Sequence, residues 1–254
     1  YAGIREISAF CKYMSKTKSD SSVPKSQIKS RERVAKRGEV FTAEREVKAM
    51  CDLVKDETER IDSRFLEPAC GDGNFLAEIL ERKLAVVSRT YAKNPNDWEK
   101  YSVVAVSSVY GVDIMADNAA VCRKRLFEIW QEQYEKHCKK LPPEQKEETK
   151  KSVRFILERN ILLCNALSLK EVDENQKDKA TPIIFSEWSL IGTKLKRRDF
   201  IFNDLVNKNY GTNLVSDSGN QAEIFSPVQD FPLIHYRKIS SAVPEPVEGP
   251  KKES

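Results

Sequence analysis

The stretch 65–76 reads Phe-Leu-Glu-Pro-Ala-Cys-Gly-Asp-Gly-Asn-Phe-Leu and carries the residue types best suited to hold a small ligand. Gly71 and Gly73 stand one residue apart, so the backbone can turn sharply and leave room for a ligand against bare main chain. The apolar periodicity of 74–84 predicts a helix directly after them. The first turn of that helix offers unpaired N–H groups and a positive dipole end, which suit polar or anionic ligand groups.

A dinucleotide site is one alternative for such a glycine corner. It requires a third glycine and an acid about 20 residues further on. This chain has Leu76 at the glycine position, and the next acid that ends a strand-like run is Asp113. The pattern therefore argues against a nicotinamide cofactor.

Four segments, in order along the chain, resemble motifs of one enzyme family. The segment 67–76 resembles the S-adenosylmethionine-binding motif of the DNA adenine methyltransferases of restriction-modification systems, which are type I modification subunits and their fused type II relatives. Upstream, 37–42 (Arg-Gly-Glu-Val-Phe-Thr) is similar to the leading cofactor motif of that family. Downstream, 110–114 (Tyr-Gly-Val-Asp-Ile) and 160–167 (Asn-Ile-Leu-Leu-Cys-Asn-Ala-Leu) are similar to its second and third strands.

This resemblance implies S-adenosylmethionine as the cofactor and a role for the matching residues. Asp113 would bind the ribose hydroxyls in a bidentate contact, Asn165 would meet the adenine amino group, and Glu67 would order the glycine loop or contact the amino group through water. Phe41 and Thr42 would close over the methionine end of the cofactor. The full set of expected cofactor-binding residues is Phe41, Thr42, Glu67, Pro68, Ala69, Gly71, Gly73, Asp113, Ile114, Asn165 and Ala166.

The chain also departs from the family pattern. Ala43 stands where the family usually has Pro, and Asn165 stands where it usually has Asp, so an acceptor remains but a charge is lost. The catalytic Asp/Asn/Ser-Pro-Pro-aromatic motif is not found, and we assign no catalytic residue. The only Pro-Pro pair, Pro142-Pro143, lies before the expected third strand and predicts a helix start. Ser186-Glu187-Trp188, after an expected fourth strand at 181–185, is a poor substitute because no proline pair stiffens it and its acid would repel phosphate.

Composition sets the remaining limits. The 254 residues carry 43 basic and 39 acidic side chains, a net charge of +4 that does not by itself indicate nucleic-acid binding. Basic residues cluster at 25–37 and 194–198, and each cluster either neutralises DNA phosphates or forms a solvated surface. No apolar run approaches the roughly 18 residues of a membrane span, and no signal peptide is evident, so we expect a cytoplasmic protein without a membrane contact.

Six scattered cysteines and two histidines, with no Cys-x-x-Cys pair, argue against a metal site. Buried free thiols in a reducing compartment are the expected state of these cysteines.

Alternation of strand-like and helix-like segments predicts an α/β fold, a doubly wound Rossmann-like methyltransferase sheet with a helical N-terminal lead and a disordered C-terminal tail. We expect a lead at 1–36 (a helix at 4–14, then a polar linker), a methyltransferase-like domain at 37–240 and a tail at 241–254. Thr42 is expected to cap a helix, and 94–96 to form a turn. Further helices are expected at 74–84 and 117–138, and edge strands at 200–205 and 231–236. The stretch 101–109 fits a strand by its valines and a helix by the family resemblance.

Along 117–138, Phe127, Trp130, Tyr134 and His137 fall on one side of the expected helix, and a packing face explains them better than a base-stacking platform.

Two classes of function remain. The first is an enzyme subunit that methylates the adenine amino group of DNA, with its catalytic loop supplied by another restriction-modification subunit or by further polypeptide. The second is a non-catalytic, cofactor-binding regulatory or assembly protein of a phage-defence system. We predict that the chain alone is catalytically weak or silent.

Overall fold

The structure is a computed structural model that describes residues 42–207, 212–215, 221–224 and 226–245. Its helices are α3 (Glu44–Asp52), α4 (Lys55–Thr58), α5 (Asn74–Tyr91), α6 (Pro95–Ser107), α7 (Ala116–His137), α8 (Pro143–Asn160), α9 (Phe202–Asn207) and the 3-10 helix η2 (Tyr236–Ser241). Its strands are β1 (Phe65–Glu67), β2 (Val109–Asp113), β3 (Ile161–Asn165), β4 (Lys170–Val172), β5 (Asp178–Pro182), β6 (Ile184–Ile191), β7 (Lys194–Ile201), β8 (Thr212–Val215), β9 (Gln221–Ile224), β10 (Gln229–Asp230) and β11 (Ile234–His235).

The central sheet has five strands in the order β1-β2-β3-β4-β5. The first three strands are parallel, and β4 and β5 add an antiparallel extension at the β3 edge. Parallel strands need long crossovers, and here each crossover is a pair of helices: α5 and α6 between β1 and β2, α7 and α8 between β2 and β3. The C-terminal ends of β1, β2 and β3 therefore lie at one edge of the sheet.

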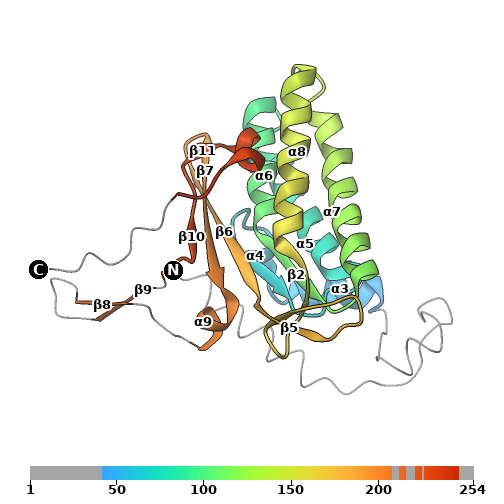
Figure 1. Cartoon of the computed structure of the whole chain (residues 1–254). Coiled ribbons are helices and arrows are strands. Elements are labelled where there is room, and N and C mark those ends of the chain that lie inside the picture. Colours follow the sequence, from blue (N-terminus) through green and yellow to red (C-terminus); the bar gives the residue numbers. More distant parts are fainter. Residues whose placement is uncertain (1–41, 208–211, 216–220, 225, 246–254) are drawn as a thin grey trace, which may run out of the picture.

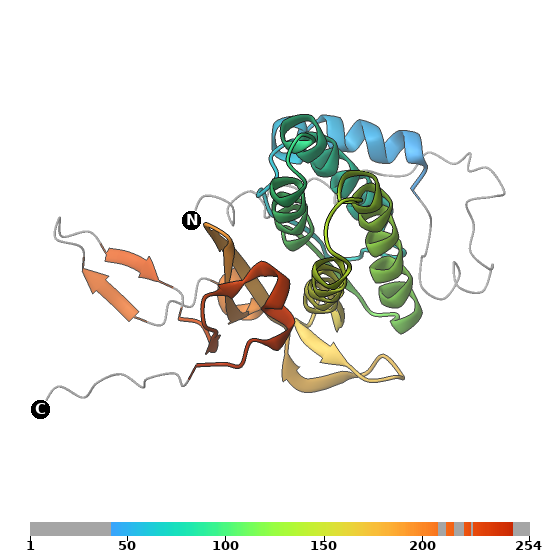
Figure 2. The same cartoon turned by 90° about the horizontal axis from the view of Figure 1, so that it is seen from above.

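The four crossover helices run side by side and contact one another, as Figure 1 shows and as the end-on view in Figure 2 confirms. Trp98, Trp130 and Tyr134 are fully buried among them. The indole of Trp130 donates to Ser102 Oγ, and the ring of Trp98 stacks on His137. The expected aromatic packing face along α7 is confirmed.

A second sheet covers the opposite face of the parallel strands. It is built on the β6–β7 hairpin, to which β10 and β11 pair antiparallel. The Tyr110 hydroxyl donates to the Ser186 carbonyl, and its ring meets Phe185 edge-on. On the other face, Gly111 lies against Cys70 and Leu76 of the glycine loop and α5. The parallel sheet is thus packed between α5 on one side and the β6–β7 hairpin on the other.

These observations establish an α/β protein with a mixed five-stranded sheet. The expected helices at 74–84 and 117–138 are confirmed, as is the helix start at Pro143. The stretch 101–109 is resolved as helix through Ser107 followed by strand β2. Residues 102–110 are buried on all sides, which explains why their valines gave no amphipathic period.

Several expected boundaries are wrong. The fourth strand at 181–185 is divided between β5, which pairs antiparallel with β4, and β6, which pairs antiparallel with β7 in the second sheet. The edge strand at 200–205 is wrong because β7 ends at Ile201, where its partner β6 begins, and helix α9 follows. Of the edge strand at 231–236, only Ile234–His235 is a strand.

Two helix starts also differ from expectation. The cap of α3 is Ala43, not Thr42, and the Glu46 carboxylate accepts a hydrogen bond from the Ala43 N–H. The expected turn at 94–96 is the start of α6, because the Asn94 side chain accepts hydrogen bonds from the N–H groups of Asn96 and Asp97.

The chain ends fall largely outside the described residues, which include neither the 1–36 lead nor most of the 241–254 tail. In the described part of the tail, the backbones of Glu245 and Asp230 form an antiparallel β-bridge. The Glu245 carboxylate lies 3.2 Å from Lys196 Nζ. Tertiary contacts therefore continue past the expected boundary at 241.

Candidate functional site

The glycine corner and the acid that ends β2 lie together. Because β1 and β2 are parallel neighbours, the loop after β1 and the last residue of β2 reach the same sheet edge. The Gly71 N–H donates to Asp113 Oδ2 at 2.9 Å, and the Cys70 N–H donates to the Val112 carbonyl. Two sequence motifs 42 residues apart therefore form one site.

The carboxylate of Asp113 is held by three donors. Its Oδ1 accepts hydrogen bonds from the Met115 N–H at 2.7 Å and the Asn118 amide at 3.3 Å, while Oδ2 accepts the Gly71 N–H. A carboxylate offers about four acceptor positions, so Oδ2 retains one for a ligand hydroxyl. In this arrangement the carboxylate can accept one ribose hydroxyl, whereas a bidentate contact would require a rearrangement.

The two glycines have different roles. Both have positive φ angles, +54° at Gly71 and +89° at Gly73, which favour glycine. A Cβ at Gly71 would meet nothing within 4 Å, so open space adjoins the backbone there. A Cβ at Gly73 would lie 2.7 Å from the Cys122 sulfur of α7. Gly71 therefore leaves room for a ligand, whereas Gly73 lets α5 pack on α7.

Glu67, the last residue of β1, contributes a buried carboxyl group. Its side chain is 7% exposed, and burial raises its pKa to about 7, with partial opposition from a hydrogen bond of the Ala69 N–H. A buried carboxyl near neutrality at a strand end is a typical feature of functional sites. A cationic ligand would favour its ionised form.

Asn165 lies at the end of β3 but its side chain is engaged locally. Its Oδ1 accepts hydrogen bonds from the N–H groups of Leu167 and Ser168, and its amide donates to Asp178 of β5 at 2.9 Å. Ala166 is half-buried and packs against the core. Adenine contact through the Asn165 acceptor would therefore compete with the turn that this side chain holds.

The remaining expected residues are placed as follows. Ile114 follows Asp113 and is 36% exposed, so an apolar surface adjoins the acid. Pro68 is half-buried and Ala69 is exposed in the loop between β1 and α5. Thr42 lies two residues before the first residue of α3, and Phe41 lies outside the described residues.

The basic cluster at 194–198 lies on β7, and its best-placed cations are already paired. Arg197 is buried against Asp199, with Nη2 2.6 Å from Oδ2. Arg198 pairs with Glu187, and Lys196 with Asp230. Each of these three residues therefore already has a carboxylate partner. The cluster at 25–37 lies outside the described residues.

Ser186 and Trp188 lie within strand β6 rather than in a loop. Both are buried: the Ser186 hydroxyl donates to Asp199 at 2.7 Å, and the Trp188 indole donates to Asn160 at 2.8 Å. Their side chains therefore hold the hairpin in place, and neither is exposed to a substrate.

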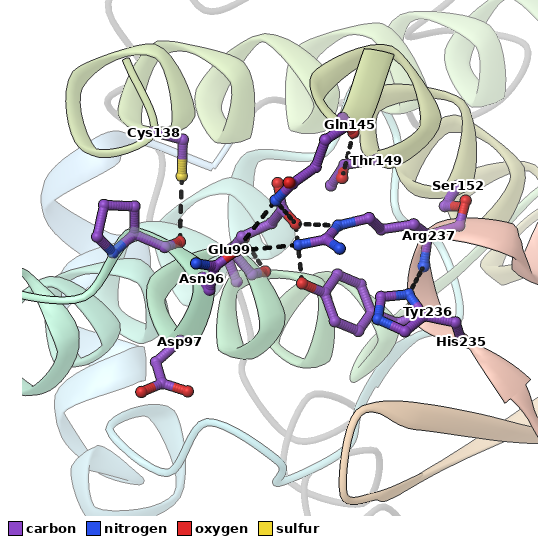
Figure 3. Close-up of polar contacts among 12 residues, drawn as sticks. Asn96, Asp97, Glu99, Cys138, Gln145, Thr149, Ser152, His235, Tyr236 and Arg237 are labelled. Atoms are coloured by element: carbon purple, nitrogen blue, oxygen red, sulfur yellow. Dashed lines mark hydrogen bonds and ion pairs between the residues drawn. The ribbon is translucent and has the colours of Figure 1, made fainter. Parts of the chain in front are cut away.

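Sequence reasoning missed a buried polar cluster around Glu99 of α6, shown in Figure 3. The Glu99 carboxylate is fully buried and accepts hydrogen bonds from the hydroxyls of Tyr134 and Tyr236 and from Arg237 at 2.6 Å. This cluster fastens η2, and with it the C-terminal part of the described chain, to α6 and α7. Glu99 gives no motif signal, because its partners are up to 138 residues away.

Among the described residues, no helix has the length and apolar character needed to cross a bilayer, and no group of three or more potential metal ligands comes together. Comparison with protein families, curated proteins and solved structures gives no match for this chain.

Proposed function

We propose that the chain is the S-adenosylmethionine-binding subunit of a DNA adenine methyltransferase of a restriction-modification system, with β1, β2 and β3 forming the first half of a Rossmann-like sheet. The observation that carries this proposal is the hydrogen bond between Gly71 and Asp113, which joins the two motifs that the resemblance assigns to the cofactor. In open α/β sheets, ligands bind outside the carboxyl ends of the strands, where this contact lies.

The site offers complementary chemistry for each part of that cofactor. Asp113 Oδ2 would accept a ribose hydroxyl, and the open space beside Gly71 would take the methionine chain. Glu67 would face the positive charges of the ammonium and sulfonium groups, while Ile114 would cover an apolar ring. DNA is then the proposed substrate, other restriction-modification subunits are the proposed partners, and the cytoplasm is the proposed location.

A non-catalytic regulatory or assembly role is the second candidate. It is favoured by the burial of Ser186 and Trp188, because these two side chains are then not available to receive a flipped adenine. Under either function the cofactor site is the same.

Calorimetric titration with S-adenosylmethionine tests the shared site. The wild-type chain should bind, and Asp113→Ala should weaken binding tenfold or more, a loss of about 1.4 kcal/mol. Asp113→Asn keeps one acceptor for the Gly71 N–H but removes the charge. Its affinity shows whether the loss in Asp113→Ala comes from the missing charge or from a loop that is no longer held by this hydrogen bond.

Asp62→Ala, at an exposed acid before β1, is the matched control and should leave the isotherm unchanged. An unchanged isotherm for Asp113→Ala would remove this residue from the site. Absence of wild-type binding, with the fold intact by circular dichroism, would reject the cofactor.

A further inference from the structure

A cavity of about 590 Å³ lies on the face of the parallel sheet opposite α5, between the two sheets. The end of α8 and strands β3, β4 and β5 line one side, and β6, β7 and the C-terminal segment line the other. Its volume falls within the range of small-molecule sites and far exceeds that of an inorganic anion. It touches Cys164, directly before Asn165, but none of the residues around the Gly71–Asp113 contact.

The charge of the lining is positive. Arg159, Lys179 and Arg197 face two carboxylates, Glu171 and Asp199, which leaves an excess of one cation. Lys179 lies 3.7 Å from Glu171, and Arg197 is paired with Asp199. Within the described part of the chain, Arg159 has no carboxylate partner. An anionic ligand would compensate this charge.

Two guanidinium groups of this cavity have defined positions. The Cζ atoms of Arg159 and Arg197 lie 5.3 and 5.4 Å from the centre of the Phe155 ring. The Arg197 Cζ also lies 4.0 Å from the centre of the Phe231 ring. Its Nε and Nη2 are bound to Ser186 and Asp199, whereas Nη1 has no hydrogen bond among the described residues. Guanidinium groups held by stacking lose little conformational freedom when they bind an anion.

Part of the lining is apolar. Leu162, Val172 and Ile184 offer aliphatic surface beside the charged groups. A ligand that fills both parts needs an anionic group and a compact ring or sugar, and a nucleotide has both. We infer that this cavity binds one nucleotide of a DNA strand, with its phosphate at Arg159 and Arg197; the choice of DNA rests on the proposed function.

Nuclear magnetic resonance of the full chain can localise such binding. Its three tryptophans give three indole N–H signals, and only Trp188 lies near the cavity, with the Arg197 Cζ 5.8 Å from its ring. Trp98 and Trp130 are buried among the crossover helices and serve as internal controls. Thymidine 5′-monophosphate is the probe, because it lacks the adenine that the cofactor site is proposed to bind. It should shift the Trp188 signal and leave the other two unchanged.

Two variants on α8 make the test specific. Arg159→Ala removes an exposed cation of the cavity and should weaken the affinity for thymidine 5′-monophosphate tenfold or more. Arg154→Ala removes an exposed cation of the same helix that stacks on Phe127, outside the cavity, and should leave the affinity unchanged. Inorganic phosphate should bind more weakly than the nucleotide, and thymidine should leave the Trp188 signal unchanged.

Three results would overturn the inference. They are no shift of the Trp188 signal at about 10 mM nucleotide, equal affinity in Arg159→Ala and the wild type, and displacement of the nucleotide by S-adenosylmethionine. The last result would mean that both ligands share the site near Asp113. Failure of cofactor binding alone, with the nucleotide still bound, would reject the proposed cofactor and leave the cavity as a nucleotide site.

Discussion

Glu67 shows how the environment of one side chain changes its chemistry. At the end of β1 it is enclosed by the core, and burial raises the pKa of its carboxyl group from 4.5 to about 7. Asp113, at the end of the neighbouring strand, instead accepts hydrogen bonds from the Gly71 and Met115 N–H groups. Two acids at one sheet edge therefore suit different parts of a ligand, one a cation and the other a hydroxyl.

The raised pKa predicts how stability depends on pH. The folded-state value lies above the unfolded one, so protonated Glu67 contributes stability below about pH 4.5, and this contribution is lost as the pH rises through about 7. Glu67→Gln should remove this loss. Its free energy of unfolding relative to wild type should rise between pH 5 and 8 by on the order of 1–3 kcal/mol.

Urea denaturation of both proteins at several pH values measures this difference. Glu132→Gln, at an exposed acid of α7, is the control and should show no such trend. If the difference in the free energy of unfolding between Glu67→Gln and wild type were constant across the pH range, the raised pKa of the buried Glu67 carboxyl would be contradicted.

The loop between β1 and α5 is the element on which the site depends. It turns through two residues with positive φ, and the first turn of α5 receives no side-chain cap at its N-terminal residue. Cys70 of this loop packs against Gly111 of β2, and Gly73 packs against Cys122 of α7. These two packing contacts hold the loop so that the Gly71 backbone lies beside open space.

The packing role of Gly73 can be measured separately from its backbone conformation. Gly71→Ala meets open space, so it should cost only the left-handed backbone penalty of about 1–2 kcal/mol. Gly73→Ala should cost about 2–4 kcal/mol, because its Cβ also overlaps the Cys122 sulfur.

A double-mutant cycle with Cys122→Ala isolates the overlap. In that background, Gly73→Ala should cost about as much as Gly71→Ala in chemical denaturation. An undiminished cost for Gly73→Ala in the Cys122→Ala background would show that the contact with Cys122 is not the cause.

At the scale of the whole molecule, the parallel strands are packed between the helices and the β6–β7 hairpin. Tyr110 fixes the hairpin to the centre of the sheet, and Arg64 pairs with Glu187 at its side, 2.7 Å apart. Glu99 of α6 accepts hydrogen bonds from Tyr236 and Arg237 and so holds η2 against the crossover helices. Within the described residues, β1 is the last strand at its edge, and the Ser186 and Trp188 side chains are buried.

Under the proposed function, the burial of Ser186 and Trp188 predicts that the chain binds S-adenosylmethionine without transferring the methyl group. Labelled S-adenosylmethionine and unmethylated DNA should give no methyl incorporation with the isolated chain. Addition of the proteins encoded by neighbouring genes should restore it if one of them supplies the catalytic loop.

The same preparation must bind the cofactor in calorimetry, so that silence does not reflect unfolded protein. Incorporation by the isolated chain would show that its own residues complete a catalytic site. Continued silence with every neighbour added would favour the regulatory role.

Much of the local structure could be predicted from the sequence. The glycine pair, the helix after it and the helix start at Pro143 depend on backbone preferences and short-range periodicity, which neighbouring residues carry. The strand end at Asp113 was also predicted correctly. Prediction was wrong at 181–185 and 200–205, where antiparallel pairing with a partner strand decides the strand ends.

The sequence by itself therefore determined the α/β class, the glycine corner and the acid that ends β2, because each leaves a local pattern. Only the tertiary structure decided that Gly71 meets Asp113, that Arg197 pairs with Asp199, and that Glu99 holds η2. Except for the short-range pair on β7, these contacts join residues far apart in the chain. Their partners are selected by strand order and burial, which no short segment encodes.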